Sequence, residues 1–396
     1  MATAKTYRAV NWLLFAYLAI FPLGQLLRLQ FLLFGHAVRF QPIDIVAGLF
    51  LILWLFEKFE RPKVYKQLSR FVAVLLFSAI FSVTYFDIRS VISGILYLIR
   101  IVSYFSFFLV LHDYFKNHSG QKELILKSLL SVGVLIAILG WLQYIFVPYF
   151  GSFRVWGWDD HLYRLIGSFL DPAFTGLLLV LAFFISLILY FNSRKNIFMS
   201  ISLGLIISVM FTYSRASYLA LVAGFFTWSV LVGKLRYFLL ILLSLVFLIF
   251  LLPRPGGAGT HLERTFSISD RFKNYSQTIE VAKYSPVFGV GYNNLCVARK
   301  TLLNYPDIYS HSCSGSDSSL LLILATTGVI GIFVFFNLAI RLIRNSERGI
   351  FGLLFLVSLT AVFIHSFFVN SMFYPWVMGW MAILASLAQS RLTRSS

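Results

Sequence analysis

The chain has 396 residues, of which 59% are hydrophobic and only 12% are charged, and its mean hydropathy is +0.84. A soluble globular chain carries about a quarter charged residues, so this composition excludes a set of soluble domains and indicates a membrane protein. The formal net charge of +18 does not indicate nucleic-acid binding, because lysine and arginine in cytoplasmic loops fix the topology of a membrane protein.

Twelve apolar stretches between clusters of charge are long enough, or nearly so, to cross about 30 Å of hydrocarbon. They cover residues 12–34, 43–56, 71–86, 91–115, 128–146, 172–190, 197–211, 216–232, 237–252, 318–340, 349–368 and 374–387. The first is too long for a signal peptide, and lipid offers no partner to unpaired backbone groups. We therefore expect an all-α polytopic membrane protein in which residues 1–396 form one integral membrane domain with about twelve transmembrane helices.

The distribution of lysine and arginine predicts which helix ends face the cytoplasm. If the N-terminus is cytoplasmic and the spans alternate, every inner loop is basic and most outer turns are short and nearly neutral. The inner basic clusters lie at residues 58–70, 116–127, 194–195, 234–236, 341–348 and 391–394. Both termini are therefore expected in the cytoplasm.

One large loop, residues 253–317, separates the ninth and tenth predicted spans on the outer face and has an excess of positive charge. Long loops escape the positive-inside rule, but this charge at a membrane face would also suit an anionic substrate. Within the loop, Phe272, Tyr275 and Ile279 recur at helical spacing. Residues 269–283 are therefore predicted to form an amphipathic helix, with its apolar face on the bundle or at the lipid interface.

Arginines on the outer face are candidate ligands for phosphate, because their planar fork matches phosphate oxygens. Arg215 lies in a tight turn between two spans, and Arg264 and Arg271 lie in the large loop, so the three could form a diphosphate clamp. Each could instead be a solvated surface residue, with Arg215 extending to the membrane surface. Arg100 falls inside the fourth span, where a structural ion pair is the favoured explanation.

Three side chains are candidate general bases. Asp317 stands at the outer end of the tenth span, and His311 and His365 are the alternatives. Each has a structural explanation as well, Asp317 as a helix cap and the histidines as hydrogen-bonded structural residues. The sequence has no spaced cluster of His, Cys and Glu of the kind that binds a metal, so neither a metal site nor a cofactor is predicted.

Both cysteines of the chain, Cys296 and Cys313, fall in the outer loop. In an oxidising compartment a disulfide between them would close a loop of about 17 residues and contribute roughly 3 kcal/mol. It would hold the turn that contains Gly289 and Gly291 close to Asp317. Two free thiols are the alternative.

Four motifs follow one another on the outer face. They are GSFLDPAFTG at residues 167–176, TYSRA at residues 212–216, SPVFGVG at residues 285–291 after Arg271, and a segment at residues 317–331 that begins Asp-Ser and ends Gly-x-x-Gly. Together they resemble the O-antigen ligase and polymerase superfamily of bacterial envelope glycosyltransferases. The ligase motif H-[NSQ]-x9-G-x-x-G is matched everywhere except at its first position, which is Asp317 here.

The resemblance implies an inverting, metal-independent glycosyltransferase of the bacterial inner membrane, with its active site facing the periplasm. The donor would be a glycan on undecaprenyl diphosphate. The resemblance implies that Arg215, and Arg271 or Arg264, bind the diphosphate, and that a base at the position of Asp317 activates the acceptor. The departure from histidine slightly favours a polymerase over a ligase that acts on lipid A-core or another acceptor.

A lipid-linked oligosaccharide flippase or a secondary transporter is the main alternative. It would place charges at mid-membrane depth, and only Arg100 plainly satisfies this. A non-catalytic scaffold is a third possibility. The expected partners are the lipid-linked donor, a glycan or lipid acceptor and membrane lipid, together with a chain-length regulator or assembly partner, and no nucleic acid.

Overall fold

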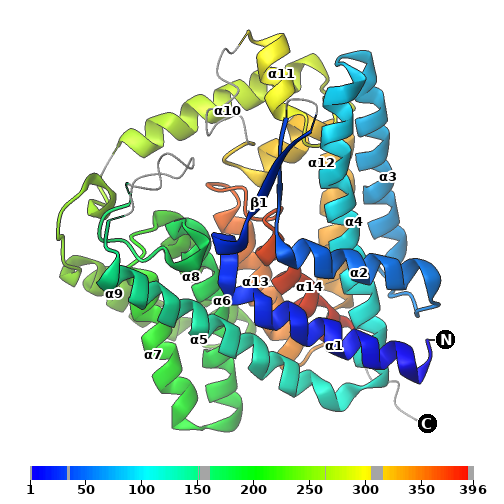
Figure 1. The fold of residues 1–396 in the computed structure, drawn as a ribbon. Helices are drawn as coiled ribbons and strands as arrows, with labels where there is room; N and C mark the ends of the chain where they lie inside the picture. Colours follow the sequence, from blue (N-terminus) through cyan, green and yellow to red (C-terminus); the bar gives the residue numbers. More distant parts are fainter. Residues whose placement is uncertain are drawn as a thin grey trace.

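The computed structural model describes residues 2–33, 36–149, 151, 161–263, 265–304 and 315–390. These residues form fourteen α-helices, short 3-10 turns and one antiparallel hairpin (Figure 1). The elements are α1 (Ala4–Ile20), η1 (Phe21–Leu27), β1 (Leu29–Leu33), β2 (His36–Phe40), α2 (Pro42–Phe56), α3 (Tyr65–Phe81), α4 (Ile88–Asn117), α5 (Lys122–Phe146), α6 (Pro172–Ser193), α7 (Asn196–Met210), α8 (Arg215–Leu231), α9 (Leu235–Leu251), α10 (Phe266–Tyr284), α11 (Leu295–Leu302), α12 (Ser319–Asn345), α13 (Ile350–His365) and α14 (Pro375–Gln389). Apart from the hairpin, the all-α prediction is confirmed.

Each predicted stretch after the first overlaps one helix. The first prediction, a single span over residues 12–34, is wrong beyond Leu27: α1 ends at Ile20, the 3-10 helix η1 continues to Leu27, and β1 begins at Leu29. Pro22 lacks a backbone N–H, and Gly24 has a φ of 55°, which a helix cannot contain. The chain therefore leaves the helix and forms the hairpin instead.

Several helices are suited to a lipid environment. Within the described ranges, six helical stretches are long and apolar enough to cross a membrane, and α2, α7, α8, α9 and α13 are shorter apolar helices. In α9 only Leu245 is buried, whereas Leu243, Phe247 and Phe250 are 67%, 62% and 78% exposed. Exposed apolar surface on this scale requires lipid around it, so the chain is a membrane protein. Twelve crossings, the orientation and the outer position of residues 253–317 stay predictions.

Helix α6 is at the centre of the bundle. Its residues 175–189 are buried without a break, and it packs against α5, α7, α8 and α13. Gly224 permits the close approach of α8, because a Cβ there would lie 2.3 Å from a ring carbon of Phe184. The N-terminal end of α6 is capped by Asp171, whose Oδ1 accepts hydrogen bonds from two backbone N–H groups of the first turn at 2.7 and 2.9 Å. This end of α6 contacts α8, because Ala173 O accepts a hydrogen bond from Ser217 Oγ at 3.2 Å.

Helix α10 confirms the predicted helix in the large loop, with slightly wider bounds. The expectation of a single apolar face holds only in part. Phe272 and Ile279 are 66% and 42% exposed, while the polar residues Asn274 and Thr278 are buried against the protein. The reason is that Asn274 and Thr278 are hydrogen-bonded to the segment that leads into α12, so their burial costs little. The second helix of the loop, α11, was not predicted.

Helix α12 is broken at Gly328, whose φ is 66° and ψ is −168°. Residues 285–291, named here the docked segment, pair with the freed backbone through three hydrogen bonds: Val329 N–H to Pro286 O (2.9 Å), Val290 N–H to Ala325 O (3.0 Å) and Gly291 N–H to Thr326 O (3.0 Å). A Cβ at Gly289 would lie 2.2 Å from the carbonyl carbon of Thr326, so only glycine fits there. The third motif, residues 285–291, and the fourth, residues 317–331, are therefore hydrogen-bonded to each other and form one joint.

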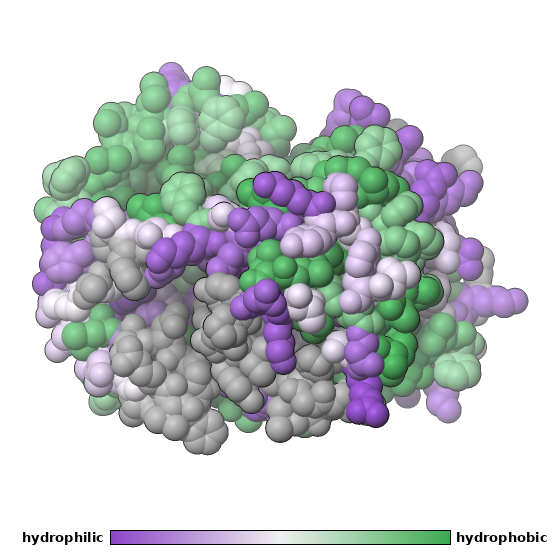
Figure 2. Space-filling view, turned by 90° about the horizontal axis from the view of Figure 1, so that it is seen from above, coloured by the Kyte–Doolittle hydropathy of each residue, from purple (hydrophilic) through white to green (hydrophobic). Residues whose placement is uncertain are grey.

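Helices α10 and α11 lie together at one end of the bundle (Figure 1). Viewed from that end, hydrophilic side chains form a band across the middle of the molecule, beside a large hydrophobic surface (Figure 2). Polar surface of this kind is what the water-facing end of a membrane protein carries.

Candidate functional site

The predicted site residues lie where the ends of α8, α12 and α13 meet the middle of α10. Three hydrogen bonds join these elements: Arg215 Nη1 to Leu262 O before α10 (3.2 Å), the Tyr275 hydroxyl of α10 to Phe367 O after α13 (2.5 Å), and Ser319 N–H of α12 to Ser366 O (2.9 Å). Because the helix ends converge, residues that are far apart in the sequence face one another.

Arg215 is the first residue of α8, and Ser214 caps the helix by accepting a hydrogen bond from its first turn. Tyr213 before the cap has a φ of 48°, so the chain reverses sharply here. Arg164, which is 8% exposed, donates from Nε to Thr212 O at 3.0 Å and from Nη2 to Tyr213 O at 3.2 Å. A buried cation thus holds the turn that presents Arg215.

Arg271 lies near Arg215, close enough for the two positive charges to repel each other. It is also near Tyr275, one turn further along α10. Burial raises the pKa of the Tyr275 hydroxyl, and the charge of Arg271 opposes this rise while the charge of Asp317 adds to it. Tyr275 is therefore within electrostatic reach of both Arg271 and Asp317, and Arg271 is within electrostatic reach of Arg215. The roles of the three charged residues in binding and catalysis stay predictions.

Asp317 is not the cap of α12. The N-cap is Ser318, whose Oγ accepts a hydrogen bond from Leu321 N–H at 3.4 Å. The carboxylate of Asp317 is therefore not needed to end the helix, and the residue is partly exposed beside α10. The explanation of Asp317 as a helix cap is therefore wrong.

A buried network fixes the backbone of Asp317. Its N–H donates to Asn274 Oδ1 at 3.0 Å. Arg299, which is 1% exposed, donates to Gly315 O at 3.1 Å, to Asn274 O at 3.3 Å and to Thr278 Oγ1 at 2.8 Å. Arg299 and Asn274 thereby hold the segment before α12 against α10, which sets the position of Asp317 relative to Arg271.

His365, at the end of α13, is completely buried. Its Nδ1 lies 2.9 Å from Ser371 Oγ, and the charge of Arg271 acts on the ring. The ring therefore lies beneath the same site, where a substrate hydroxyl does not reach it without rearrangement. Asp317, which is partly exposed, is better placed to meet one.

Three of the predicted residues, Arg264, His311 and Cys313, lie outside the described residues. The third arginine, the second histidine and the disulfide therefore stay predictions. Cys296 is partly exposed in α11. Among the described residues there is no group of three or more His, Cys, Asp or Glu that could hold a metal ion.

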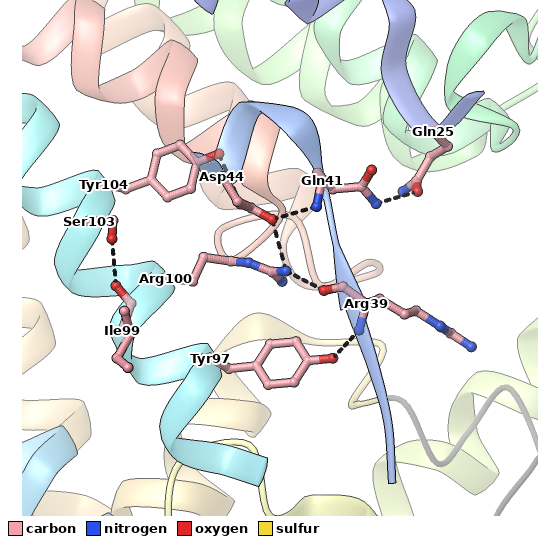
Figure 3. A network of polar contacts seen from close by, with 9 residues as sticks. All are labelled: Gln25, Arg39, Gln41, Asp44, Tyr97, Ile99, Arg100, Ser103 and Tyr104. Carbon is pink, nitrogen blue, oxygen red and sulfur yellow. Dashed lines mark hydrogen bonds and ion pairs between the residues drawn. The ribbon is translucent and has the colours of Figure 1, made fainter. Parts of the chain in front are cut away.

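Arg100 forms a structural ion pair, which was the favoured explanation from the sequence. Its Nη2 lies 2.9 Å from Asp44 Oδ2 and donates to Arg39 O at 2.5 Å (Figure 3). Asp44 also accepts hydrogen bonds from Gln41 N–H at 2.9 Å and from the Tyr104 hydroxyl at 3.3 Å. The pair ties α4 to α2 and to the hairpin, so Arg100 is part of the framework.

The sequence did not single out Asn274, Arg164 or Arg299. The two arginines bond mainly to backbone carbonyls from 16 to 49 residues away, and no local pattern reveals such partners. The sequence signal for Arg164 and Arg299 is weak: both are basic residues in predicted outer segments, where positive charge is disfavoured.

The described helices and the polar residues gathered at their ends define an integral membrane protein with a polar site at one end of its bundle. Residues 201–336 match the family model described as O-antigen ligase, so the chain carries a domain of that family and the resemblance read from its motifs is confirmed. The family match implies that the protein is an enzyme, a glycosyltransferase. No curated protein matches the chain.

The matched segment runs from α7 into α12. It contains Arg215, Arg271, Asp317 and the docked segment, whereas His365 lies beyond its end. The residues that the structure brings to the convergence of α8, α10 and α12 therefore fall within the part of the chain that carries the family match.

Proposed function

We propose that the protein is an inverting, metal-independent glycosyltransferase that transfers a glycan from undecaprenyl diphosphate in the assembly of O-antigen or another surface polysaccharide. Its site faces the periplasm, in the inner membrane of a bacterium, with both chain termini in the cytoplasm. Its partners are the lipid-linked donor, a glycan or lipid acceptor and membrane lipid, and a chain-length regulator or assembly partner acts beside it.

The convergence of Arg215, Arg271 and Asp317 carries this proposal. The diphosphate leaving group gains negative charge in the transition state, and two arginines that repel each other in the free protein are poised to bind it. They supply the charge compensation that a metal ion supplies in other glycosyltransferases. Asp317 accepts the proton of the acceptor hydroxyl, which attacks the anomeric carbon from the face opposite the diphosphate and inverts it.

The acceptor decides between a polymerase and a ligase. The family ligase motif has histidine where this chain has Asp317, so we favour a polymerase, in which the acceptor is a second lipid-linked glycan. Asp317 is favoured as the base over His365 because His365 is 0% exposed.

The flippase alternative loses one candidate residue. Arg100 was the plainest candidate for a transport charge at mid-membrane depth, and it forms an ion pair with Asp44. A paired framework arginine provides no free charge for a moving substrate.

The proposal is tested with purified protein, an undecaprenyl diphosphate-linked repeat unit and three acceptor conditions: no addition, lipid A-core, and protein in liposomes without acceptor. Arg215→Ala and Asp317→Ala are the test variants. The exposed residues Arg236 and Asp270 provide matched controls, Arg236→Ala and Asp270→Ala, which remove the same charges elsewhere. We expect a ladder of longer lipid-linked glycans from wild type and both controls, and a loss of at least about a hundredfold in both test variants.

Each other outcome has a definite meaning. Product that forms only with lipid A-core identifies a ligase. Full activity in Arg215→Ala and Asp317→Ala removes these residues from the mechanism. Movement of the lipid across liposomes without any glycan product replaces the enzyme by a flippase.

A further inference from the structure

A second group of arginines surrounds the base of the β1–β2 hairpin. Arg39 on β2 is paired with Gln30 on β1, and Arg28 stands two residues before Gln30 in extended conformation. Alternate residues of an extended chain point to the same side, so Arg28 and Arg39 project from one face of the hairpin. Burial lowers the pKa of Arg28, and the charge of Arg39 lowers it further, so the two charges are within electrostatic reach of each other.

Asp44, the carboxylate near these arginines, already forms an ion pair. Asp44 is 6% exposed and is paired with Arg100 at 2.9 Å. Within the described ranges the side chain of Arg39 has no hydrogen bond or ion pair, and Figure 3 shows it extending away from the network. Arg39 therefore carries a positive charge that Asp44 does not neutralise.

The position of Arg39 is fixed through its backbone. Its N–H donates to the Tyr97 hydroxyl at 3.4 Å, and its carbonyl accepts from Arg100 Nη2 at 2.5 Å. Tyr97 and Arg100 lie one turn apart on α4, and the guanidinium of Arg100 lies 4.9 Å from the centre of the Tyr97 ring. The backbone is thus held on both sides while the charged end stays exposed. The cation is therefore attached to a fixed backbone, and only its side chain has to be ordered when it binds an anion.

This group is linked to the site of Arg215 through the first turn of α6. The ring of Phe174 stacks on Tyr374 at 3.7 Å, and Tyr374 lies within electrostatic reach of Arg28. Ala173 O accepts a hydrogen bond at 3.2 Å from Ser217, which lies two residues after Arg215. Both arginine groups are therefore linked to the first turn of α6, one through Tyr374 and the other through Ser217.

We propose that Arg28 and Arg39 bind the phosphate groups of the acceptor, a second prenyl diphosphate-linked glycan, while Arg215 and Arg271 bind those of the donor. This rests on the proposed function. A polymerase joins two molecules that each carry a lipid diphosphate, so its site needs two anion-binding groups on the same membrane face. Two arginine groups linked to one helix end meet that requirement.

The test measures how many equivalents of farnesyl diphosphate, a short prenyl diphosphate, bind to the purified protein in phosphatidylcholine nanodiscs by calorimetry. Wild type is expected to bind two equivalents. Arg39→Gln is expected to weaken one of them about tenfold to a hundredfold, because a charge-assisted hydrogen bond is lost, and Arg39→Lys to weaken it less. Arg215→Ala is expected to weaken the other. Arg236→Gln removes an exposed arginine of α9 and serves as the matched control, with two equivalents retained.

Competition by inorganic pyrophosphate at the Arg39-dependent site supports recognition of the phosphates themselves, and failure to compete overturns it. If Arg39→Gln binds two equivalents of farnesyl diphosphate with the affinity of the wild type, the proposal is overturned. An effect seen only in phosphatidylglycerol nanodiscs overturns it as well, since it would assign the arginines to bilayer lipid. If Arg39→Gln loses one equivalent while Arg215→Ala keeps both, the acceptor site stands and the proposed donor site fails, so the two are distinguishable.

Discussion

Arg299 is a fully buried cation that supports the candidate base without contacting the site. Arg299→Met would leave Gly315 O, Asn274 O and Thr278 Oγ1 without their charged donor. Breaking such a buried network costs about 3–5 kcal/mol, so we expect a marked fall in the melting temperature in detergent. Lys300→Met is the control, because Lys300 is the exposed neighbour on the same helix. An equal melting temperature for both variants would contradict a structural role for Arg299.

The hydroxyl of Tyr275 joins α10 to the turn after α13 through Phe367 O at 2.5 Å. Tyr275→Phe removes this bond and keeps the ring, so about 1 kcal/mol of local stability is lost. We expect amide hydrogen exchange in the N-terminal half of α10 to rise about fivefold. Tyr284→Phe on the same helix is the matched control, since its hydroxyl bonds to Leu302 O at 3.1 Å away from the site. Unchanged exchange near Arg271 in Tyr275→Phe would show that α10 is held by other contacts.

Among the elements, the joint between α12 and the docked segment tolerates least change. Gly289 has a φ of 72°, and a Cβ there would overlap the backbone of Thr326. We expect Gly289→Ala to abolish a monodisperse folded protein in detergent, as judged by gel filtration. Gly204→Ala is the control: nothing lies within 4 Å of a Cβ at that position in α7, and alanine favours a helix by about 0.5–1 kcal/mol. Normal elution of Gly289→Ala would mean that the joint can open without loss of the fold.

Sequence periodicity and charge predicted the helices well, because an apolar stretch in lipid has few alternatives to a helix. They failed at residues 28–33, which were included in the first span because the apolar composition continues, although Pro22 and Gly24 end the α-helix and the chain then forms β1. They also failed to show that α12 is broken. Gly328 alone does not reveal a break, because its partners in the docked segment lie about forty residues earlier.

The candidate site was predicted only by residue type. Arg215, Arg271 and Asp317 were selected because their charges stand at predicted helix ends, and a family motif supported the choice. Arg299 and Asn274 could not be selected, because their importance comes from hydrogen bonds to distant backbone groups. The second arginine group was hidden for a related reason: Arg28 and Arg39 come together only through a hairpin whose first strand was predicted as part of a membrane span.

For the whole molecule, the positive-inside rule predicts that α10 is periplasmic and that the start of α3 is cytoplasmic. Lys283 and Lys66 are exposed residues of these two helices. In a Cys296→Ser, Cys313→Ser background, we expect Lys283→Cys to react with a membrane-impermeant maleimide in cells with a permeabilised outer membrane. Lys66→Cys should react only after the inner membrane is lysed. The opposite pattern would invert the topology and place the site in the cytoplasm.

The joint in α12 also constrains how the protein is made. The docked segment leaves the ribosome before residues 325–329, so the partners of Ala325 O, Thr326 O and Val329 N–H are already present when the broken helix reaches the bilayer. If α12 came first, its unpaired peptide groups would meet hydrocarbon, at a cost of several kcal/mol each. The order of the two motifs along the gene therefore protects the helix during biogenesis, and a circular permutant that reverses their order would insert this helix without its partner.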